Sequence, residues 1–400
     1  MAGPVELGPT SSLRNNLTSQ RAQQPHLPLL QHKTPHPTFT DSYGASYDPW
    51  PNGWGHSLTE DTTGIVRLFT KNFNSITPSK DKTCNPKFTN GIGQLHKFGA
   101  GFLLGQEPCI DFKQHGQQQE LKYAYMKKFK SSRTTTACSA IPAATGTYLP
   151  GGALVTTFGK WAGRILSSGS DPLGRWAWQR LMGKDDKIVH IISAYRVSQN
   201  SADIDKTTAY SQQYQMLMDL DHTNPNPKEQ FITDLRTHIQ TSAKNEMLII
   251  GLDANEDVLP EDSPAKETSI TALMRDLNLI DVFEHQHGTT GDTSRKNAKK
   301  IDHVLVSENV LPAIQHSGFL PWNAIMESDH RTGFVDFDAL TLFGNSDDLT
   351  HTATRKLTTD YPEAMEEYLT HLQKGFADRN VLSALSRIVL LAKKMGGLQS

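Results

Sequence analysis

The sequence predicts a layered α/β or α+β sandwich, in which strands dominate and helices are inserted between some of them. Short apolar runs of strand character recur between residues 64 and 337. Helical patterns separate only some of these runs, which disfavours a regular barrel with a helix after every strand. With 400 residues, 36% hydrophobic and 20% charged, the chain can bury one large core and still carry tails.

The strand signal is clearest at residues 64–72, where apolar and polar residues roughly alternate as in a half-buried strand. The other segments of strand character are residues 102–104, 153–158, 189–195, 247–250, 303–306 and 333–337. Apolar residues at helical spacing predict helices over residues 207–218, 229–241 and 269–277. The main folded domain is therefore expected at residues 63–343.

The two ends of the chain differ from this domain in character. Residues 1–62 are rich in Pro, Gln, His, Ser and Thr and have almost no apolar periodicity, which predicts a disordered N-terminal tail. Residues 344–400 predict a C-terminal extension of two amphipathic helices, with apolar stripes from Met365 to Phe376 and from Val381 to Ala392. We expect this helical hairpin to pack on the main domain, on a partner, or on sequence outside this chain.

Charge and cysteine content limit the classes of protein. The 40 basic and 42 acidic residues give no global positive field, although Arg295, Lys296, Lys299 and Lys300 could form a local basic face rather than a solvated loop. The three cysteines have no metal-binding spacing, which favours a reducing compartment. No apolar stretch approaches the ~20 residues of a membrane span. We therefore expect an intracellular protein that does not act at a membrane, and the sequence does not distinguish nucleus from cytoplasm.

Acids, amides and a histidine stand at the ends of the strand-like runs. Side chains in these positions can converge on one edge of a sheet. Together they could bind a metal and activate a water molecule for the hydrolysis of a phosphate ester. The residues concerned are Asn72, Asn74, Glu107, Tyr195, Arg196, Asp253, Asn255, Asp302, Asp329 and His330.

The oxygen-rich side chains predict a hard divalent cation, Mg²⁺ or alternatively Mn²⁺. Such a cation keeps several waters and needs only one or two carboxylates besides the substrate phosphate. Glu107 is the first choice as a metal ligand, with Asn72 or Asn74 assisting and Asp329 sharing.

The remaining polar groups predict acid–base chemistry on a water molecule. Histidine titrates near neutral pH, so His330 suits the general base, with Asp302 holding its ring in one tautomer. Asp253 and Asn255 then lie near the attacking water and the leaving oxygen. The Tyr195 hydroxyl is available to a phosphate oxygen.

In this order and spacing, the motifs resemble the endonuclease/exonuclease/phosphatase superfamily over residues 64–340. This superfamily includes exonuclease III, abasic-site endonucleases, LINE-type retrotransposon endonucleases and phosphatases. The motifs are Asn72-Phe-Asn74, Gln106-Glu107, Tyr195, Asp253-Ala-Asn255, Ile301-Asp302-His303-Val-Leu-Val-Ser and Ser328-Asp329-His330. The resemblance implies a four-layered α/β sandwich of two facing mixed sheets, DNase I-like, with the site at their shared edge. It also implies the roles given above, and leaves open whether His330 or Asp253 deprotonates the water.

Within the superfamily, the Asn72-Phe-Asn74-Ser-Ile opening and the short Ile301–Ser307 motif resemble nucleases, retrotransposon-type ones in particular. The helical extension would suit a piece of a longer mobile-element polyprotein. Two departures concern the site: Ser75 replaces a glycine after Asn74, and His303 replaces a tyrosine that nucleases often have.

The predicted function is a Mg²⁺-dependent phosphodiester hydrolase, a DNA endonuclease of retrotransposon or repair type. The alternatives are a phosphatase or phospholipase of the same superfamily, and an inactive nucleic-acid- or protein-binding derivative. Substrate contacts are expected from Arg196, from Lys299 in the basic loop, and from Trp322, which could also be a core residue.

Overall fold

The computed structural model describes most of the central domain and parts of both ends. The described residues are 39–40, 46–47, 53–76, 85–143, 146–199, 208–258, 267–289, 291–296, 298–345 and 362–378, with a further six between 380 and 387.

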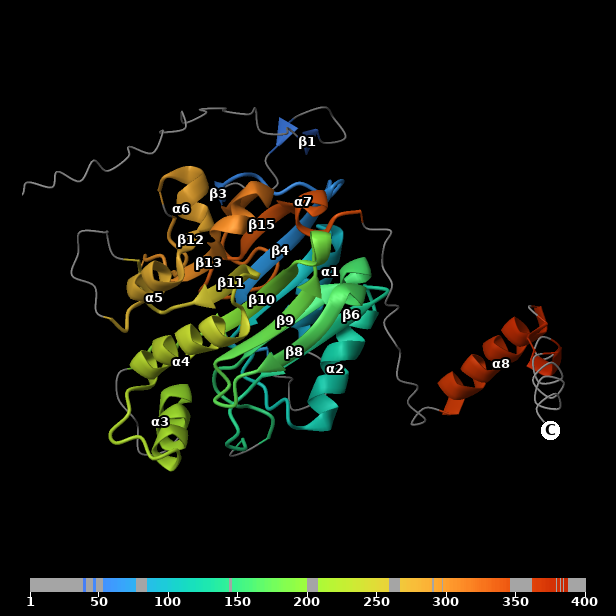
Figure 1. Cartoon of the computed structure of the whole chain (residues 1–400), viewed down its shortest axis with the longest axis horizontal. Helices are drawn as coiled ribbons and strands as arrows, with labels where there is room; N and C mark the ends of the chain where they lie inside the picture. Colours follow the sequence, from blue (N-terminus) through green and yellow to red (C-terminus); the bar gives the residue numbers. More distant parts are fainter. Residues whose placement is uncertain are drawn as a thin grey trace, which may run out of the picture.

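Two mixed β-sheets lie face to face (Figure 1). The seven-stranded sheet has the order β3 (Trp54–Gly55), β14 (Ile314–Phe319), β15 (Gly333–Asp338), β4 (Ile65–Asn72), β5 (Ala100–Gln106), β7 (Ala153–Phe158) and β6 (Ser132–Ala137). The six-stranded sheet has the order β12 (Leu279–Asp281), β13 (Asp302–Ser307), β11 (Met247–Asp253), β10 (Ile188–Tyr195), β9 (Trp176–Met182) and β8 (Ile165–Ser170). The pairs β4–β5 and β10–β11 are parallel and the other pairs antiparallel.

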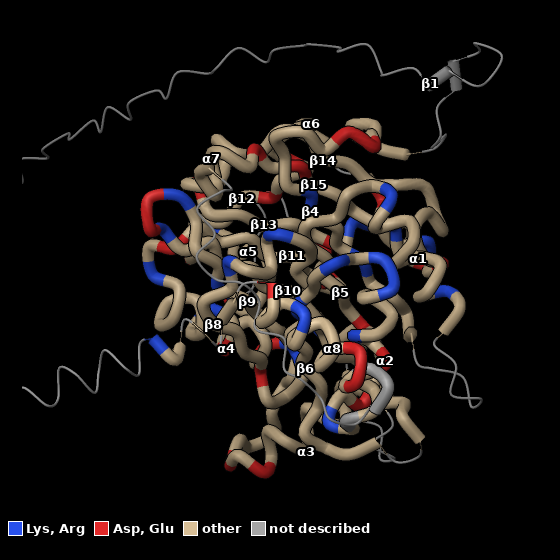
Figure 2. Tube along the Cα trace, turned by 90° about the vertical axis from the view of Figure 1, so that its right-hand side faces the viewer, with Lys and Arg blue, Asp and Glu red and all other residues tan. Residues whose placement is uncertain are grey.

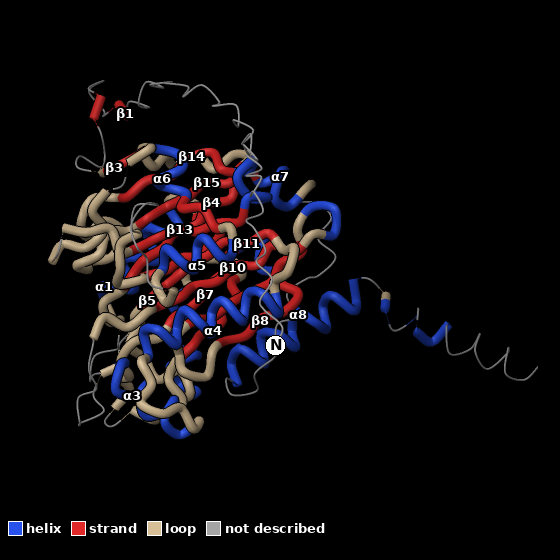
Figure 3. The backbone as a smooth tube through the Cα atoms, turned by 60° about the vertical axis from the view of Figure 1, so that its left-hand side comes forward, coloured by secondary structure: helices blue, strands red, loops and turns tan. Residues whose placement is uncertain are grey.

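Helices cover both outer faces of the sandwich, which Figure 3 shows as blue segments outside the red strands. The helices are α1 (Pro86–Lys97), α2 (His115–Met126), α3 (Ala209–Asp219), α4 (Pro227–Ser242), α5 (Ile270–Leu277), α6 (Val282–His287) and α7 (Ala339–Phe343). One core lies between the sheets, a second joins α1 and α2 to the seven-stranded sheet, and a third joins α4 and α5 to the six-stranded sheet. The four-layered sandwich predicted from the sequence is confirmed.

The folded domain begins before residue 63, where the sequence placed its start. β3 pairs with the end of β14, the ring of Trp54 lies 5.5 Å from that of Phe319, and Leu58 is buried. The segment from residue 53 therefore belongs to the sandwich, because an aromatic side chain closes the edge of the larger sheet. Of the earlier residues, the structure describes only the short strand pair β1 (Phe39–Thr40) and β2 (Ser46–Tyr47).

The C-terminal extension contains one described helix, α8 (Pro362–Asp378), which lies apart from the sandwich in Figure 1. Tyr368, Leu369 and Phe376 of its apolar stripe are exposed. The second helix of the predicted hairpin falls mostly outside the described residues. Among the helices that are described, none has the length and apolar character to cross a membrane.

Basic and acidic residues alternate over the face of the molecule shown in Figure 2. This distribution agrees with the net charge of −2. Any site that attracts an anion must therefore depend on a local group of basic side chains.

Candidate active site

The ends of five strands meet at one edge of the sandwich. Asn72 of β4 is the register partner of Gln106, which directly precedes Glu107. In the other sheet, Asp253 of β11 pairs with Tyr195 on one side and with Asp302 on the other. Because β13 runs antiparallel to β11, its first residue lies where β11 ends, so the carboxylates of Asp253 and Asp302 come together.

Asn72 connects the two sheets through its side-chain amide. Its Nδ2 donates to Glu107 Oε2 at 2.8 Å and to Asp253 Oδ2 at 2.7 Å, while its Oδ1 accepts the Asn74 N–H at 2.8 Å. Asn72 therefore orients the two carboxylates with its nitrogen. Burial, followed by the charge of Asp302, raises the pKa of Asp253 well above its ordinary value.

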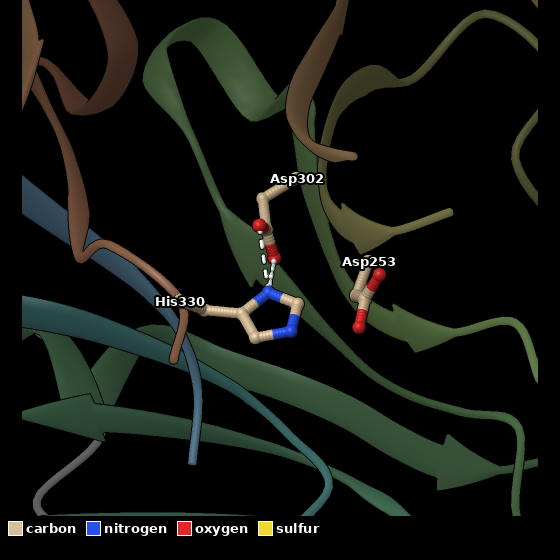
Figure 4. A group of neighbouring side chains, drawn as sticks. All are labelled: Asp253, Asp302 and His330. Carbon is tan, nitrogen blue, oxygen red and sulfur yellow. Dashed lines mark hydrogen bonds and ion pairs between the residues drawn. The ribbon is translucent and has the colours of Figure 1, made fainter. Parts of the chain in front are cut away.

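His330 and Asp302 form a buried pair on the other side of Asp253. His330 Nδ1 lies 2.8 Å and 3.1 Å from the two carboxylate oxygens of Asp302. Its second ring nitrogen, Nε2, faces Asp253 (Figure 4). Burial alone would lower the pKa of His330, but the charge of Asp302 and the hydrogen bond to it raise the pKa to about 10. The imidazole therefore holds a proton at neutral pH, and this proton faces the Asp302 carboxylate.

These carboxylates fit a divalent cation. Asp253, Asp302 and His330 each offer a ligand atom within 4.8 Å of the others, and Asn72 joins Glu107 to Asp253. Burial raises the pKa of Asp253, the nearby charges of Asp302 and Glu107 raise it further, and a bound cation would favour the ionised carboxylate. A donor set dominated by carboxylate oxygens suits a hard cation.

Two of the expected metal ligands lie together at the rim. Asn74 Nδ2 donates to Asp329 Oδ1 at 2.9 Å, and the other Asp329 oxygen lies 2.7 Å from Lys296 Nζ. Asn74 and Ser75 both have positive φ, 45° and 70°, so this turn adapts to the missing glycine at a cost in backbone strain. Asp329 therefore lies where it can hold the rim in place, with its charge balanced by Lys296.

Tyr195 and Asn255 also reach this edge. Tyr195 is buried, and burial followed by the charges of Glu107 and Asp253 raises the pKa of its phenol well above the ordinary value. Its hydroxyl thus stays a hydrogen-bond donor. The Asn255 amide donates to the Arg196 carbonyl at 2.7 Å, which fixes the turn after β11.

Arg196 does not have the position expected of a substrate contact. It is 5% exposed, and its guanidinium donates to the carbonyls of Lys228 and Ala254 and to the carboxylate of Glu256. In this geometry Arg196 supports the turn after β11. Lys299 is exposed and Trp322 half-buried, so both can meet a substrate.

The loop that carries Asp329 and His330 is anchored from below by groups to which the sequence analysis gave no role. The Lys71 ammonium, fully buried, donates to the His330 carbonyl at 2.5 Å, and Ser328 Oγ donates to the Asn72 carbonyl at 2.8 Å. Met326 packs directly against Gly91 of α1, where an added Cβ would lie 2.2 Å from it. A lysine directly before Asn72, at the end of a buried strand, is the signal that could have revealed the first of these anchors.

A buried ion-pair cluster holds the start of β13 from behind. Asp281 Oδ2 lies 2.8 Å from Lys300 Nζ and 2.9 Å from His303 Nδ1, and His303 Nε2 lies 3.1 Å from the Glu256 carbonyl. His303, which stands where a tyrosine was expected, is thus held beside Asp302 by contacts at both ring nitrogens. Burial would raise the pKa of Asp281, but the bond to His303 and the charge of Lys300 hold it below its ordinary value.

Asp281→Asn should destabilise the domain by about 3–5 kcal/mol at neutral pH, because it leaves Lys300 buried without its counter-charge. Since the folded-state pKa of Asp281 is depressed, its contribution is present above the unfolded pKa of about 4 and is lost as pH falls through the folded pKa. Urea unfolding gives the free energy of unfolding of the unmutated protein and of Asp281→Asn, and the difference between them should narrow below about pH 4. The exposed Asp257→Asn serves as control. An equal difference in free energy of unfolding at neutral and acid pH would contradict the ion-pair role.

No family model matches this chain, and neither does any curated protein sequence. Solved structures do match it. An AP endonuclease, LMAP, from Leishmania major has a TM-score of 0.49 and 14% identity over 70% of this chain and 89% of its own. The endonuclease domain of TRAS1, a telomere-specific non-LTR retrotransposon, has a TM-score of 0.42 and 14% identity over 69% and 99%.

A Bacteroides vulgatus protein described as an endonuclease/exonuclease/phosphatase has a TM-score of 0.46 and 15% identity, over 69% of this chain and 99% of its own. At identities this low, residue roles must follow from the geometry of the site.

Proposed function

We propose that this protein is a Mg²⁺-dependent phosphodiester hydrolase that cuts a DNA strand internally. The observation that carries the proposal is the meeting of two functional groups at one edge of the sandwich. Nε2 of His330, oriented by Asp302, faces Asp253 (Figure 4), and Asn72 ties Asp253 to Glu107. A phosphate bound at this edge would meet both a base and a carboxylic acid.

The residues of the chain divide the work as follows. His330 accepts a proton from the attacking water at Nε2, and Asp302 fixes the ring tautomer through Nδ1 and stabilises the imidazolium that forms. The resting proton of His330 must leave first, and neutralisation of the neighbouring carboxylates lowers the pKa of His330 toward its ordinary value. Asp253, whose pKa is raised, donates a proton to the leaving oxygen.

A divalent cation would be held by Glu107, with Asp253 beside it, and when bound it supplies charge neutralisation for the phosphate oxygens. The Tyr195 hydroxyl donates to a phosphate oxygen from the same edge. The likeness of the motifs to repair and retrotransposon endonucleases favours DNA as the polymer.

The test compares polymeric and small substrates. The purified chain is incubated with supercoiled plasmid and Mg²⁺ and, in parallel, with inositol phosphates and sphingomyelin. Conversion of plasmid to nicked circles, with no product released from the small substrates, is the expected result. Phosphate or headgroup release without nicking would contradict the proposal in favour of a phosphatase or phospholipase. No product from any substrate would favour a binding protein.

A further inference from the structure

Two guanidinium groups lie over one indole ring beside the candidate active site. Cζ of Arg331 lies 4.6 Å and Cζ of Arg295 lies 5.2 Å from the ring centroid of Trp322. Arg295 is exposed, while Arg331 and Trp322 are half-buried. The indole therefore serves as a support for the two cations, and stacking of a base on it is not what this arrangement favours.

This arginine–tryptophan group is joined directly to the loop of the proposed base. The Arg295 N–H donates to the Asp329 carbonyl at 2.8 Å, and the Arg331 N–H donates to the Thr293 carbonyl at 2.9 Å. Between these bonds, Ser294 and His330 form an antiparallel bridge. Both guanidiniums are thus carried by backbone that is hydrogen-bonded in register with His330.

The local charge is positive although the chain as a whole is near neutral. Arg295, Lys296, Lys299 and Arg331 are opposed by Asp292, Glu327 and Asp329, and the charge of Asp329 is already paired with Lys296 at 2.7 Å.

A guanidinium that rests on an aromatic face keeps its in-plane N–H donors and loses much of its rotational freedom. It is therefore oriented in advance for bidentate bonds to a phosphate. A small phosphate ester bound beside His330 and Asp253 has no second phosphate to offer these arginines. A polynucleotide carries more phosphates along the strand.

We propose that Arg295 and Arg331, supported by Trp322, bind a phosphate of the substrate strand next to the phosphate that is cleaved. This inference rests on the proposed function and specifies its substrate as a polynucleotide strand. The group would fix the strand relative to His330 through its backbone, without reading sequence.

The test measures binding of a labelled oligonucleotide to His330→Ala protein in EDTA, so that no cleavage interferes, over a series of salt concentrations. Arg295→Gln, added to this protein, should weaken binding roughly tenfold and reduce the slope of log affinity against log salt by about 1. Trp322→Leu should weaken binding while leaving the slope unchanged, because both charges remain. Arg295→Lys should restore the slope and only part of the affinity.

Arg133→Gln, on the exposed edge strand β6, is the matched control and should change neither quantity. If Arg295→Gln also changes neither, while the unmutated protein nicks plasmid, the phosphate contact is disproved and the proposed function stands. Both proposals fail if the unmutated protein does not nick plasmid and the His330→Ala protein does not bind the oligonucleotide. Thermal unfolding of each variant excludes loss of the fold as the cause.

Discussion

Replacing His330 with alanine should lower the rate of plasmid nicking about 10²–10⁴-fold, because the water loses its general base. The expected fall lies in kcat, since His330 acts on the attacking water more than on substrate affinity. His330 is almost fully buried and pairs only through Nδ1 with Asp302, so the ring has no structural partner at Nε2 among the described hydrogen bonds. Single-turnover nicking under saturating protein gives the rate directly.

The matched control for this variant is His285→Ala, on the exposed side of α6, which should cleave at the unmutated rate. Asp302→Asn provides a second check, because Asp302 and His330 act as a unit. The double variant should then be no slower than His330→Ala alone. A His330→Ala protein with full activity would show that another group deprotonates the water.

Asp253→Asn should cause a loss of similar size, about 10²–10⁴-fold, because asparagine keeps the shape of the side chain and cannot protonate the leaving oxygen. An asparagine has one acceptor oxygen, so it keeps either the Asn72 contact, now made at Oδ2, or the turn contact from the Asn255 N–H, now made at Oδ1 at 3.0 Å. Thermal unfolding of the variant separates the loss of one of these contacts from a defect in the rate of cleavage.

A substrate with an activated leaving group tests this role of Asp253. A p-nitrophenyl phosphodiester needs little protonation of its leaving oxygen, so Asp253→Asn should be much less impaired on it than on plasmid. Asp257→Asn, exposed in the loop after β11, is the control for removal of a carboxylate. Equal impairment on both substrates would assign Asp253 to metal binding instead of proton transfer.

The features predicted well from the sequence are those in which a buried strand ends in a polar residue. β4, β10 and β11 alternate or run apolar until Asn72, Tyr195 and Asp253 end them, so both strands and site residues stand out. The edge strands β6 and β8 were missed because their sequences, Ser-Arg-Thr-Thr-Thr-Ala and Ile-Leu-Ser-Ser-Gly-Ser, show no core face.

Other features depend on contacts that no local pattern encodes. α1 begins with an Asn85 cap and Pro86, yet Gly91 and Gly93 weaken its helical signal, and Gly91 is explained only by Met326 packing on it. The use of the Asn72 nitrogen on Asp253, 181 residues away, likewise follows from the meeting of the two sheets. Arg295 and Arg331 likewise meet on Trp322 only because the two loops that carry these arginines pair with each other through backbone hydrogen bonds.

The most direct test of the central claim is a Mg²⁺ titration of EDTA-treated protein, with cleavage and metal binding followed on the same samples. Nicking should be absent in EDTA and should rise as calorimetry shows saturable Mg²⁺ binding. Glu107→Gln should weaken that binding about 10–100-fold, a loss typical of changes at residues around a metal site. Nicking that persists in EDTA, or Mg²⁺ affinity unchanged by Glu107→Gln, would contradict a metal-dependent hydrolase centred on Glu107.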